Sequence, residues 1–372
     1  MTHLPVWTGR GAPAVDALRS GLRRLLLLSI LGAAACGPTS TGDGTGAGRS
    51  NAERGAPGSY LGQEPPGEEP VLFAPGVVST GLHTRDLTMT PEGDEIYFSV
   101  QAGPFAAILG TRLAEGRWTE PEVVSFSRDP STMELEPHVA PDGRRFFFVS
   151  NRPADGSPMP AEERGQLAQA DIWVMDRAGD GWGKPRNLGA PVNTEASEFF
   201  PSVTRDGTLY FTREDPATGR NFIYRARSSP NGYGEPERLP EAVNSANQFN
   251  AFVDPDESYL ILGVFGRGDS TGGTDYYVVF RDPDDTWHGP VNLGPAVNQP
   301  RGAEWSPFVS PDGRYFFFMS TRQPYPNAAP QRLSFDWLKE FAAGPESGNP
   351  AIYWMEAGFL EDLRREVAAA RE

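Results

Sequence analysis

Five polar side chains recur at one position of a repeated pattern, and three of them are carboxylates. Nine residues before the last residue of a recurring turn stand, in chain order, Thr84, Glu134, Glu198, Gln248 and Glu304, which we call the polar ring. If five repeats surround one axis, these groups could coordinate a cation or hydrogen-bond a sugar or a peptide. Paired carboxylates could also perform acid–base chemistry. The alternative is that each residue binds the loop backbone of its own repeat.

Other catalytic or metal-binding patterns are weak. His3, His83, His138 and His288 are scattered and form no His-Glu-x-x-His motif, so structural roles are predicted for them. No catalytic residue, cofactor or metal ligand is therefore assigned, apart from the cation that the polar ring could hold. The aromatic run 146–148 is predicted to be core packing.

Composition narrows the function classes. The formal net charge is −16, which disfavours binding to the phosphate backbone of nucleic acids. The chain has 42 Gly and 36 Pro, and aromatic and β-branched residues lie between them, which is typical of an all-β protein rich in turns. The single cysteine, Cys36, excludes an internal disulfide.

The setting of Cys36 predicts export. Basic residues including Arg23 and Arg24 precede a short apolar run over 25–31, and small residues lead to Cys36, as at the end of a signal peptide. Small residues ending in cysteine resemble a bacterial lipobox, although Ala33 stands where that motif usually has Leu. The resemblance implies that residues 1–36 are a leader and that Cys36 carries lipid. With Gly37 next, it also implies sorting to the outer membrane. The alternatives are an ordinary signal peptide and a twin-arginine leader at Arg23-Arg24, whose surrounding residues match that motif poorly.

The rest of the chain divides into a linker and a repeat domain. Residues 37–70 are rich in Gly, Pro, Ser, Thr and Glu, which predicts a flexible tether. From residue 71 to 372 a turn recurs, with Pro, Asp and Gly each suited to closing a hairpin. Its copies are Thr90-Pro91-Glu92-Gly93, Ala140-Pro141-Asp142-Gly143, Thr204-Arg205-Asp206-Gly207, Asp254-Pro255-Asp256-Glu257 and Ser310-Pro311-Asp312-Gly313.

Each turn belongs to a unit of four short strands. In the second unit these strands are predicted at 136–139, 145–150, 171–176 and 186–189. Four antiparallel strands per unit are typical of a β-propeller blade. The fifth unit lacks its own fourth strand, whereas the segment 69–73 resembles one. We therefore predict an all-β fold of five four-stranded blades, closed by an N-terminal strand and followed by a short C-terminal helix.

The motifs resemble a known repeat family. The Ser-Pro-Asp-Gly turn, the Phe316-Phe317-Phe318-Met319-Ser320 run and the Asp171-Ile172-Trp173 strand are similar to the WD40-like (PD40) repeat of TolB-type β-propellers. The resemblance covers residues 71–372. It implies a propeller fold, and it leaves function open, because such propellers include scaffolds, binding proteins and enzyme-associated modules.

Two insertions interrupt the repeats between the second and third strands, at 151–170 and 321–350. Both are expected to lie over the mouth of the central channel, and Ser334 is expected to cap a short helix. The sequence thus predicts an envelope-anchored, non-catalytic propeller that binds a protein, peptide or glycan on its channel-mouth face. The lipid alone would anchor the protein in the outer membrane. The propeller would then face the periplasm or the cell surface. The alternative is a glycan hydrolase or lyase, since five-bladed glycosidases use carboxylates around their axis.

Overall fold

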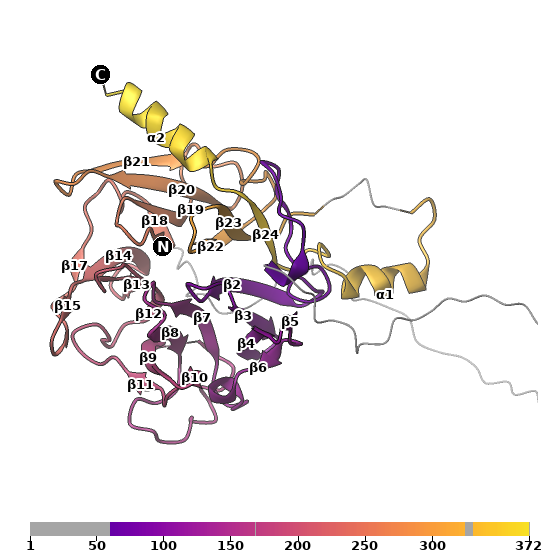
Figure 1. Cartoon of the computed structure of the whole chain (residues 1–372), viewed down its shortest axis with the longest axis horizontal. Coiled ribbons are helices and arrows are strands. Elements are labelled where there is room, and N and C mark those ends of the chain that lie inside the picture. Colours follow the sequence, from indigo (N-terminus) through magenta and orange to yellow (C-terminus); the bar gives the residue numbers. More distant parts are fainter. Residues whose placement is uncertain (1–59, 168, 324–329, 372) are drawn as a thin grey trace, which may run out of the picture. The chain divides into compact units, whose positions relative to one another are not determined.

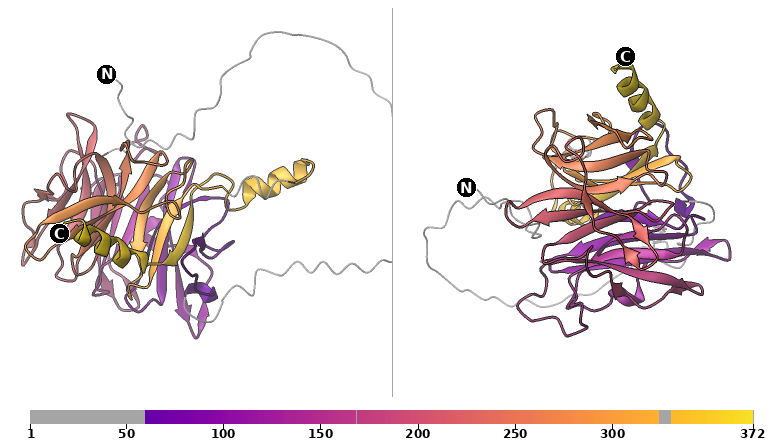
Figure 2. Two further views of the ribbon diagram at one scale, coloured as in Figure 1. Left: turned by 90° about the horizontal axis from the view of Figure 1, so that it is seen from above. Right: turned by 90° about the vertical axis from the view of Figure 1, so that its left-hand side faces the viewer.

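A computed structural model describes residues 60–167, 169–323 and 330–371. Five antiparallel sheets surround a central axis in this region (Figure 1). Figure 2 shows the same sheets from two further sides. The predicted five-bladed propeller is therefore confirmed. The leader 1–36 with Cys36, and the tether up to residue 59, lie outside the described residues. Within the described ranges, no helix is both long and apolar enough to cross a membrane.

Blades 1 to 4 follow one another along the chain, and each starts with its inner strand. Blade 1 comprises β2 (His83–Met89), β3 (Glu95–Ala102), β4 (Phe105–Ala114), β5 (Arg117–Trp118) and β6 (Glu122–Val123). Blade 2 comprises β7 (Glu134–Val139), β8 (Arg145–Ser150), β9 (Asp171–Ala178), β10 (Gly181–Trp182) and β11 (Arg186–Asn187). Blade 3 comprises β12 (Glu198–Val203), β13 (Leu209–Asp215), β14 (Arg220–Ala226) and β17 (Glu237–Arg238), with the hairpin β15 (Ser228–Ser229) and β16 (Gly232–Tyr233) beside it. Blade 4 comprises β18 (Asn247–Val253), β19 (Tyr259–Phe265), β20 (Thr274–Arg281) and β21 (Trp287–Asn292).

Blade 5 joins the two ends of the repeat domain. Its strands are β22 (Glu304–Val309), β23 (Tyr315–Ser320), β24 (Ala351–Glu356) and the N-terminal β1 (Val71–Leu72). Val71 pairs with Trp354, and Phe73 is fully buried with its ring 5.3 Å from that of Trp354. The prediction that an N-terminal strand closes the ring is confirmed. Closure removes the sheet edge that blade 5 would otherwise expose.

The recurring turns have the backbone conformation that their residues predict. The last residue of each turn is left-handed, with φ of 70° at Gly93, 67° at Gly143, 89° at Gly207, 58° at Glu257 and 71° at Gly313. Four of the five are glycine, which adopts this conformation without a steric penalty. The turns therefore set the step from the inner to the second strand in every blade. Behind them the run Phe146–Phe148 is fully buried, as predicted.

Residues 60–70, which the sequence assigns to the tether, contact blade 5. The ring of Tyr60 lies 5.1 Å from Tyr315 and 5.3 Å from Trp354. Gln63 donates to Leu72 O at 2.8 Å and accepts from Ala74 N at 2.7 Å. Aromatic burial and these two hydrogen bonds thus fix the chain ahead of β1, so the described contacts begin before residue 71.

Two α-helices accompany the sheets. Ser334 caps α1 (Phe335–Ala343) by accepting from Trp337 N, as predicted, and α1 extends away from the five sheets (Figure 1). Its C-terminal end is held near the start of β2, where Asn349 donates to Gly81 O at 2.8 Å. The predicted C-terminal helix is α2 (Phe359–Ala369), which buries Leu360.

Candidate functional site at the propeller axis

The three carboxylates of the polar ring are bound within their own blades. Each has no exposed surface. Their side-chain donors, at 2.7–3.2 Å, are Ser127, Ser150 and Arg152 for Glu134, Thr194 and Arg213 for Glu198, and Ser320 for Glu304. Burial raises the pKa of Glu198, and it raises the pKa of Glu304 to about 8.

The other two members of the polar ring also bind backbone groups, one of them in a neighbouring blade. Thr84 donates to Val78 O at 3.1 Å. Gln248 donates to Asn221 O at 2.7 Å and accepts from Ala246 N at 3.1 Å. Within the described residues, no hydrogen bond or ion pair joins one member to another, so the structure does not bring the five together. The contacts of the three carboxylates fit the alternative, a role inside each blade, whereas Gln248 of blade 4 binds Asn221 of blade 3.

A second set of side chains lies two residues further along the same inner strands. In every blade the strand register shifts here, which is the signature of a β-bulge. The bulge residues, which we call the axial ring, are all left-handed: Asp86 (φ 57°), Glu136 (φ 57°), Phe200 (φ 52°), Asn250 (φ 53°) and Ser306 (φ 66°). None is glycine, so each inner strand accepts a disfavoured conformation. A bulge re-aims a side chain, and this one occurs in all five blades.

A buried charge cluster connects three blades of the axial ring. Arg85 of blade 1 donates to Asp86 Oδ1 at 2.7 Å and to Glu136 Oε1 of blade 2 at 2.5 Å. Glu136 Oε2 accepts from Phe200 N of blade 3 at 2.6 Å. The exposed fractions of Arg85, Asp86 and Glu136 are 2%, 3% and 4%. The two carboxylates therefore share one guanidinium out of contact with bulk water.

The remaining contacts of the axial ring extend to blades 4 and 5. Ser306 donates to Asp86 Oδ1, and Asn250 Nδ2 lies 3.4 Å from Ser306 Oγ. Asp86 Oδ2 and Asn250 Oδ1 are buried acceptors for which no donor lies among the described residues. Bonds at the axis thus link all five blades and leave two acceptor atoms unused.

Burial dominates the protonation of this cluster. It raises the pKa of Glu136 to about 7, against the opposing effect of Arg85. Burial alone would lower the pKa of Arg85, but Asp86 and Glu136 outweigh it and raise that pKa. The cluster therefore combines a permanent cation with a carboxyl group that can change its charge near neutral pH.

A cavity of about 310 Å³ opens beside this cluster, and all five blades contribute to its lining. Its aromatic walls are Phe199, Phe249, Phe265 and Trp305. Its polar lining residues are Arg85, Glu136, Ser197, Glu214, Asn221, Asn247, Asn250 and Thr274. We call it the axial cavity. No member of the polar ring lines it, so the predicted site residues and the residues at the cavity are different sets on the same strands.

Among the described residues, one of the two insertions reaches the axial cavity. Leu167 and Ala170, from 151–170, line it, as expected for an insertion at the channel mouth. The described part of 321–350 contributes no lining residue, because α1 extends away from the sheets (Figure 1). The described residues of the second insertion thus give no contact with the axial cavity, and the expectation that it lies over the channel mouth stays a prediction.

The sequence does contain a signal for the cavity. One residue after each member of the polar ring come Arg85, Leu135, Phe199, Phe249 and Trp305. Three of these five are aromatic, and four line the cavity. In the alignment of the five repeats, the positions one and two residues after the polar ring therefore point to the axial cavity.

Histidines and metals add little to the site. His138 accepts from Val203 N at 3.0 Å, and burial lowers its pKa to about 4. His83 is also buried enough for its pKa to fall to about 4, and His288 Nε2 lies 2.8 Å from Asp282 Oδ2. His3 lies outside the described residues. In the part of the chain that the structure describes, no group of three or more His, Cys, Asp or Glu side chains could hold a metal ion.

The chain also contains a Gly-x-Ser-x-Gly segment, Gly268-Asp269-Ser270-Thr271-Gly272. In hydrolases such a Gly-x-Ser-x-Gly segment needs a strand-to-helix turn and a histidine beside the serine. Here it lies in the loop between two strands, β19 and β20. Ser270 Oγ has no hydrogen-bond partner among the described residues. The pattern therefore lacks the geometry of a catalytic serine.

Comparison with known proteins finds likeness to solved structures alone. No family model and no curated protein matches the sequence. Similar solved structures include a putative TolB from Agrobacterium tumefaciens, with 14% identity and a TM-score of 0.41, covering 74% of this chain and 90% of that one. TolB from Acinetobacter baumannii shows 16% identity and a TM-score of 0.40, covering 74% of this chain and 57% of that one. An arabinanase from Bacillus subtilis shows 11% identity and a TM-score of 0.43, and the match covers 73% of this chain and 93% of the arabinanase. TolB proteins, whose repeat the turn motif resembles, are thus among the similar structures.

Proposed function

We propose that this chain is an envelope-anchored, non-catalytic propeller that binds a protein, peptide or glycan through the axial cavity. One observation carries the proposal: Phe199, Phe249 and Trp305 stand at equivalent positions of three neighbouring blades and face one cavity with a polar floor. Aromatic walls around a few fixed polar groups are typical of ligand sites. All three aromatic side chains are only partly buried, so they present surface to a ligand.

The polar floor supports the same proposal. Arg85 and Glu136 are held in place by bonds across blades, which fixes their orientation before a ligand arrives. Asn250 adds an acceptor without a donor. A buried acceptor left unbonded costs about 1–3 kcal/mol, and a ligand hydroxyl or amide that donates to Asn250 Oδ1 would remove that cost.

Loss of the aromatic walls tests the proposal. The purified full chain is screened against arrays of envelope glycans and peptides, and the affinity of a positive ligand is measured by calorimetry. Phe249→Ala combined with Trp305→Ala should weaken binding at least about tenfold, because aromatic side chains dominate such contacts. Phe105→Ala, which removes a side chain 54% exposed and outside the cavity, is the matched control. Equal affinity of both variants would contradict the proposal.

Anchoring is proposed from the leader pattern, in which small residues precede Cys36. Cys36→Ser should release the protein from the membrane fraction, because it removes the only thiol that could carry lipid. The measurement is the fractionation of cells that express either form, with detergent phase partitioning as a second readout. Unchanged membrane association of the variant would refute a lipid anchor at this residue.

A glycan hydrolase or lyase is the second candidate, and one observation favours it. Glu136 lines the cavity, and its pKa of about 7 would let it donate a proton at neutral pH. Both of its oxygens already accept hydrogen bonds, from Arg85 and from Phe200 N, which favours a binding protein. Release of reducing ends from a bound glycan, abolished in Glu136→Gln while the glycan still binds, would establish the enzyme instead.

A further inference from the structure

The junction between blades 1 and 2 contains an internal ion pair at the turn end of the blades. Arg177 of β9 donates to both oxygens of Glu95 of β3, at 2.6 and 2.9 Å. The guanidinium of Arg177 also lies 4.7 Å from the ring centroid of Trp182. A carboxylate and a guanidinium in this two-bond arrangement fill the junction and neutralise each other.

The junction between blades 2 and 3 has the same backbone and different side chains. Arg145 is the first residue of β8, and Glu95 is the first residue of β3. The backbone carbonyl of Arg145 accepts from Ala140 N at 2.9 Å, and that of Glu95 accepts from Thr90 N at 3.0 Å. Ser228 pairs with Tyr233 as Arg177 pairs with Trp182. In the junction between blades 2 and 3, Arg145 thus takes the position of Glu95. Ser228 takes the position of Arg177.

This replacement leaves a guanidinium without a counterion. Among the described residues, no carboxylate lies within ion-pair distance of Arg145. Its guanidinium lies over the ring of Phe147 at 5.6 Å and donates to Tyr233 Oη at a long 3.4 Å. A positive charge is therefore held between two blades of a protein whose net charge is −16.

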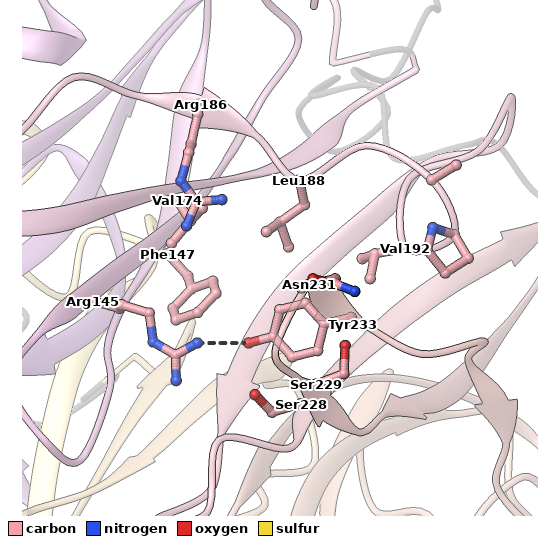
Figure 3. Close-up of a pocket in the computed structure, with 13 residues that line it drawn as sticks. Arg145, Phe147, Val174, Arg186, Leu188, Val192, Ser228, Ser229, Asn231 and Tyr233 are labelled. Atoms are coloured by element: carbon pink, nitrogen blue, oxygen red, sulfur yellow. Dashed lines mark hydrogen bonds between the residues drawn. The ribbon is translucent and has the colours of Figure 1, made fainter.

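The space that the ion pair fills in one junction is open in the other. A cavity of about 300 Å³, which we call the junction cavity, is lined by Arg145, Arg186, Ser228, Ser229, Asn231 and Tyr233, among others. Figure 3 shows Arg145 and Tyr233 pointing toward each other, with Ser228 and Ser229 beside them. These groups offer guanidinium and hydroxyl donors around one space.

Carboxylates near the junction cavity are few and exposed. Asp176 lies 3.8 Å from Arg186, with side chains 67% and 56% exposed, so this pair is weak and both groups can move. Asp142 affects Tyr233 electrostatically, and it accepts from the backbone of Arg144. Neither supplies the bound carboxylate that Glu95 supplies in the first junction.

We propose that the junction cavity binds an oxyanion, with a ligand carboxylate, or a phosphate or sulfate group of similar size, in the place that the Glu95 carboxylate takes between blades 1 and 2. Arg145 would bind two of its oxygens through the guanidinium fork, and Ser228 and Tyr233 would donate to the same group. The site lies at the turn end of the strands, whereas the axial cavity lies where the inner strands begin. The two sites can therefore be tested separately.

Thermal unfolding and calorimetry of the full chain test this proposal. Acetate, sulfate and phosphate are titrated separately against chloride at equal ionic strength, so that the three arms distinguish the oxyanions. At least one should raise the unfolding midpoint in a saturable way. Arg145→Gln should weaken that binding about ten- to a hundredfold, as expected for loss of charged hydrogen bonds. Arg144→Gln removes the same charge from an exposed neighbour and should leave the binding unchanged.

A charge exchange provides the second variant. Arg145→Glu combined with Ser228→Arg rebuilds in this junction the pair that Glu95 and Arg177 form in the other. It should raise the unfolding midpoint in chloride and abolish the saturable response to the oxyanion. No saturable response to any of the three anions, or an equal response in the wild-type chain, Arg145→Gln and the exchanged variant, would overturn the proposal.

Discussion

The polar ring and the axial ring lie two residues apart on the same five strands, and their contacts differ. Members of the polar ring, such as Glu134 and Glu198, are bonded inside their own blades. Members of the axial ring, such as Glu136, are bonded across blades. The carboxylates of the polar ring hold their own blades, and the axial ring joins the blades at the axis.

Residue types follow the same division. The polar ring has glutamate in three blades, because one structural task recurs there. The axial ring holds Asp, Glu, Phe, Asn and Ser, so its five positions do different things in an otherwise repeated backbone. In a repeat protein, a side chain that recurs serves the repeat, whereas side chains that differ between repeats create an asymmetric site. That asymmetry is what a specific ligand, or an acid distinct from a base, needs.

The largest effect is expected from the centre of the axial ring. Arg85→Met removes the cation that Asp86 and Glu136 share, and it leaves two carboxylates buried together. Breaking a buried pair in this way costs about 3–5 kcal/mol of unfolding free energy. Urea denaturation at pH 7.5 measures it. Stability should partly return at pH 5, because protonation removes the uncompensated negative charge.

An exposed ion pair provides the control for Arg85. Arg205 and Asp256 join neighbouring blades with side chains 64% and 69% exposed. Arg205→Met should cost at most about 1 kcal/mol. If the two arginine variants lose similar stability, the axial ring does not hold the blades together, and the contrast with the polar ring disappears.

The polar ring should show a smaller loss without a binding defect. Glu134→Gln and Glu198→Gln each remove the carboxylate partner of an arginine whose side chain is 20% and 17% exposed. Since these arginines can turn toward water, we expect about 1–3 kcal/mol for each variant. Binding at the axial cavity should be unchanged. Unaltered stability with weakened binding would return the ligand site to the polar ring.

The sequence predicted the elements whose causes are local. Pro-Asp-Gly turns fix the hairpin within four residues, so the number of blades and the β8 strand could be read from their spacing. The closing strand was also predictable, because the segment at Val71 resembles the outer strands of other blades. The bulges of the inner strands could not be predicted, because no residue type marks them. They arise where the five inner strands meet at the axis. Neither could Arg145 be recognised as unpaired, because its missing partner, at Ser228, is set by the next blade.

The polar ring also predicts a dependence of stability on pH. Burial raises the pKa of Glu304 to about 8, above the ordinary value of 4.5. The folded state therefore binds this proton more tightly, so its stabilising effect is complete below about pH 4.5 and is lost as the pH rises to 8. Glu304→Gln cannot ionise, so its unfolding free energy should fall less than that of the wild-type chain between pH 5 and pH 8. Glu120→Gln, at an exposed position, should follow the wild-type curve.

The smallest loss of stability is expected at Asn250, and Asn244, in the loop that precedes the same inner strand, makes the comparison sharp. Asn244 is fully bonded: it accepts from Ile223 N at 2.8 Å and donates to Ile223 O and Leu239 O at 3.1 and 2.8 Å. Asn250 has one long contact, 3.4 Å to Ser306 Oγ, and an unused acceptor. Asn244→Ala should therefore cost about 1–3 kcal/mol, and Asn250→Ala less than about 1 kcal/mol.

Ligand affinity should reverse that order. Asn250 lines the axial cavity and Asn244 does not, so Asn250→Ala should weaken ligand binding while Asn244→Ala leaves it unchanged, once both variants are measured at a temperature where they are folded. A side chain that contributes little to stability, sits in a strained left-handed position and keeps a buried acceptor free is retained for a contact outside its own blade. If Asn250→Ala changes neither stability nor the affinity of any ligand found by the array screen, the axial ring is a structural joint alone, and the binding surface must be sought elsewhere on the propeller.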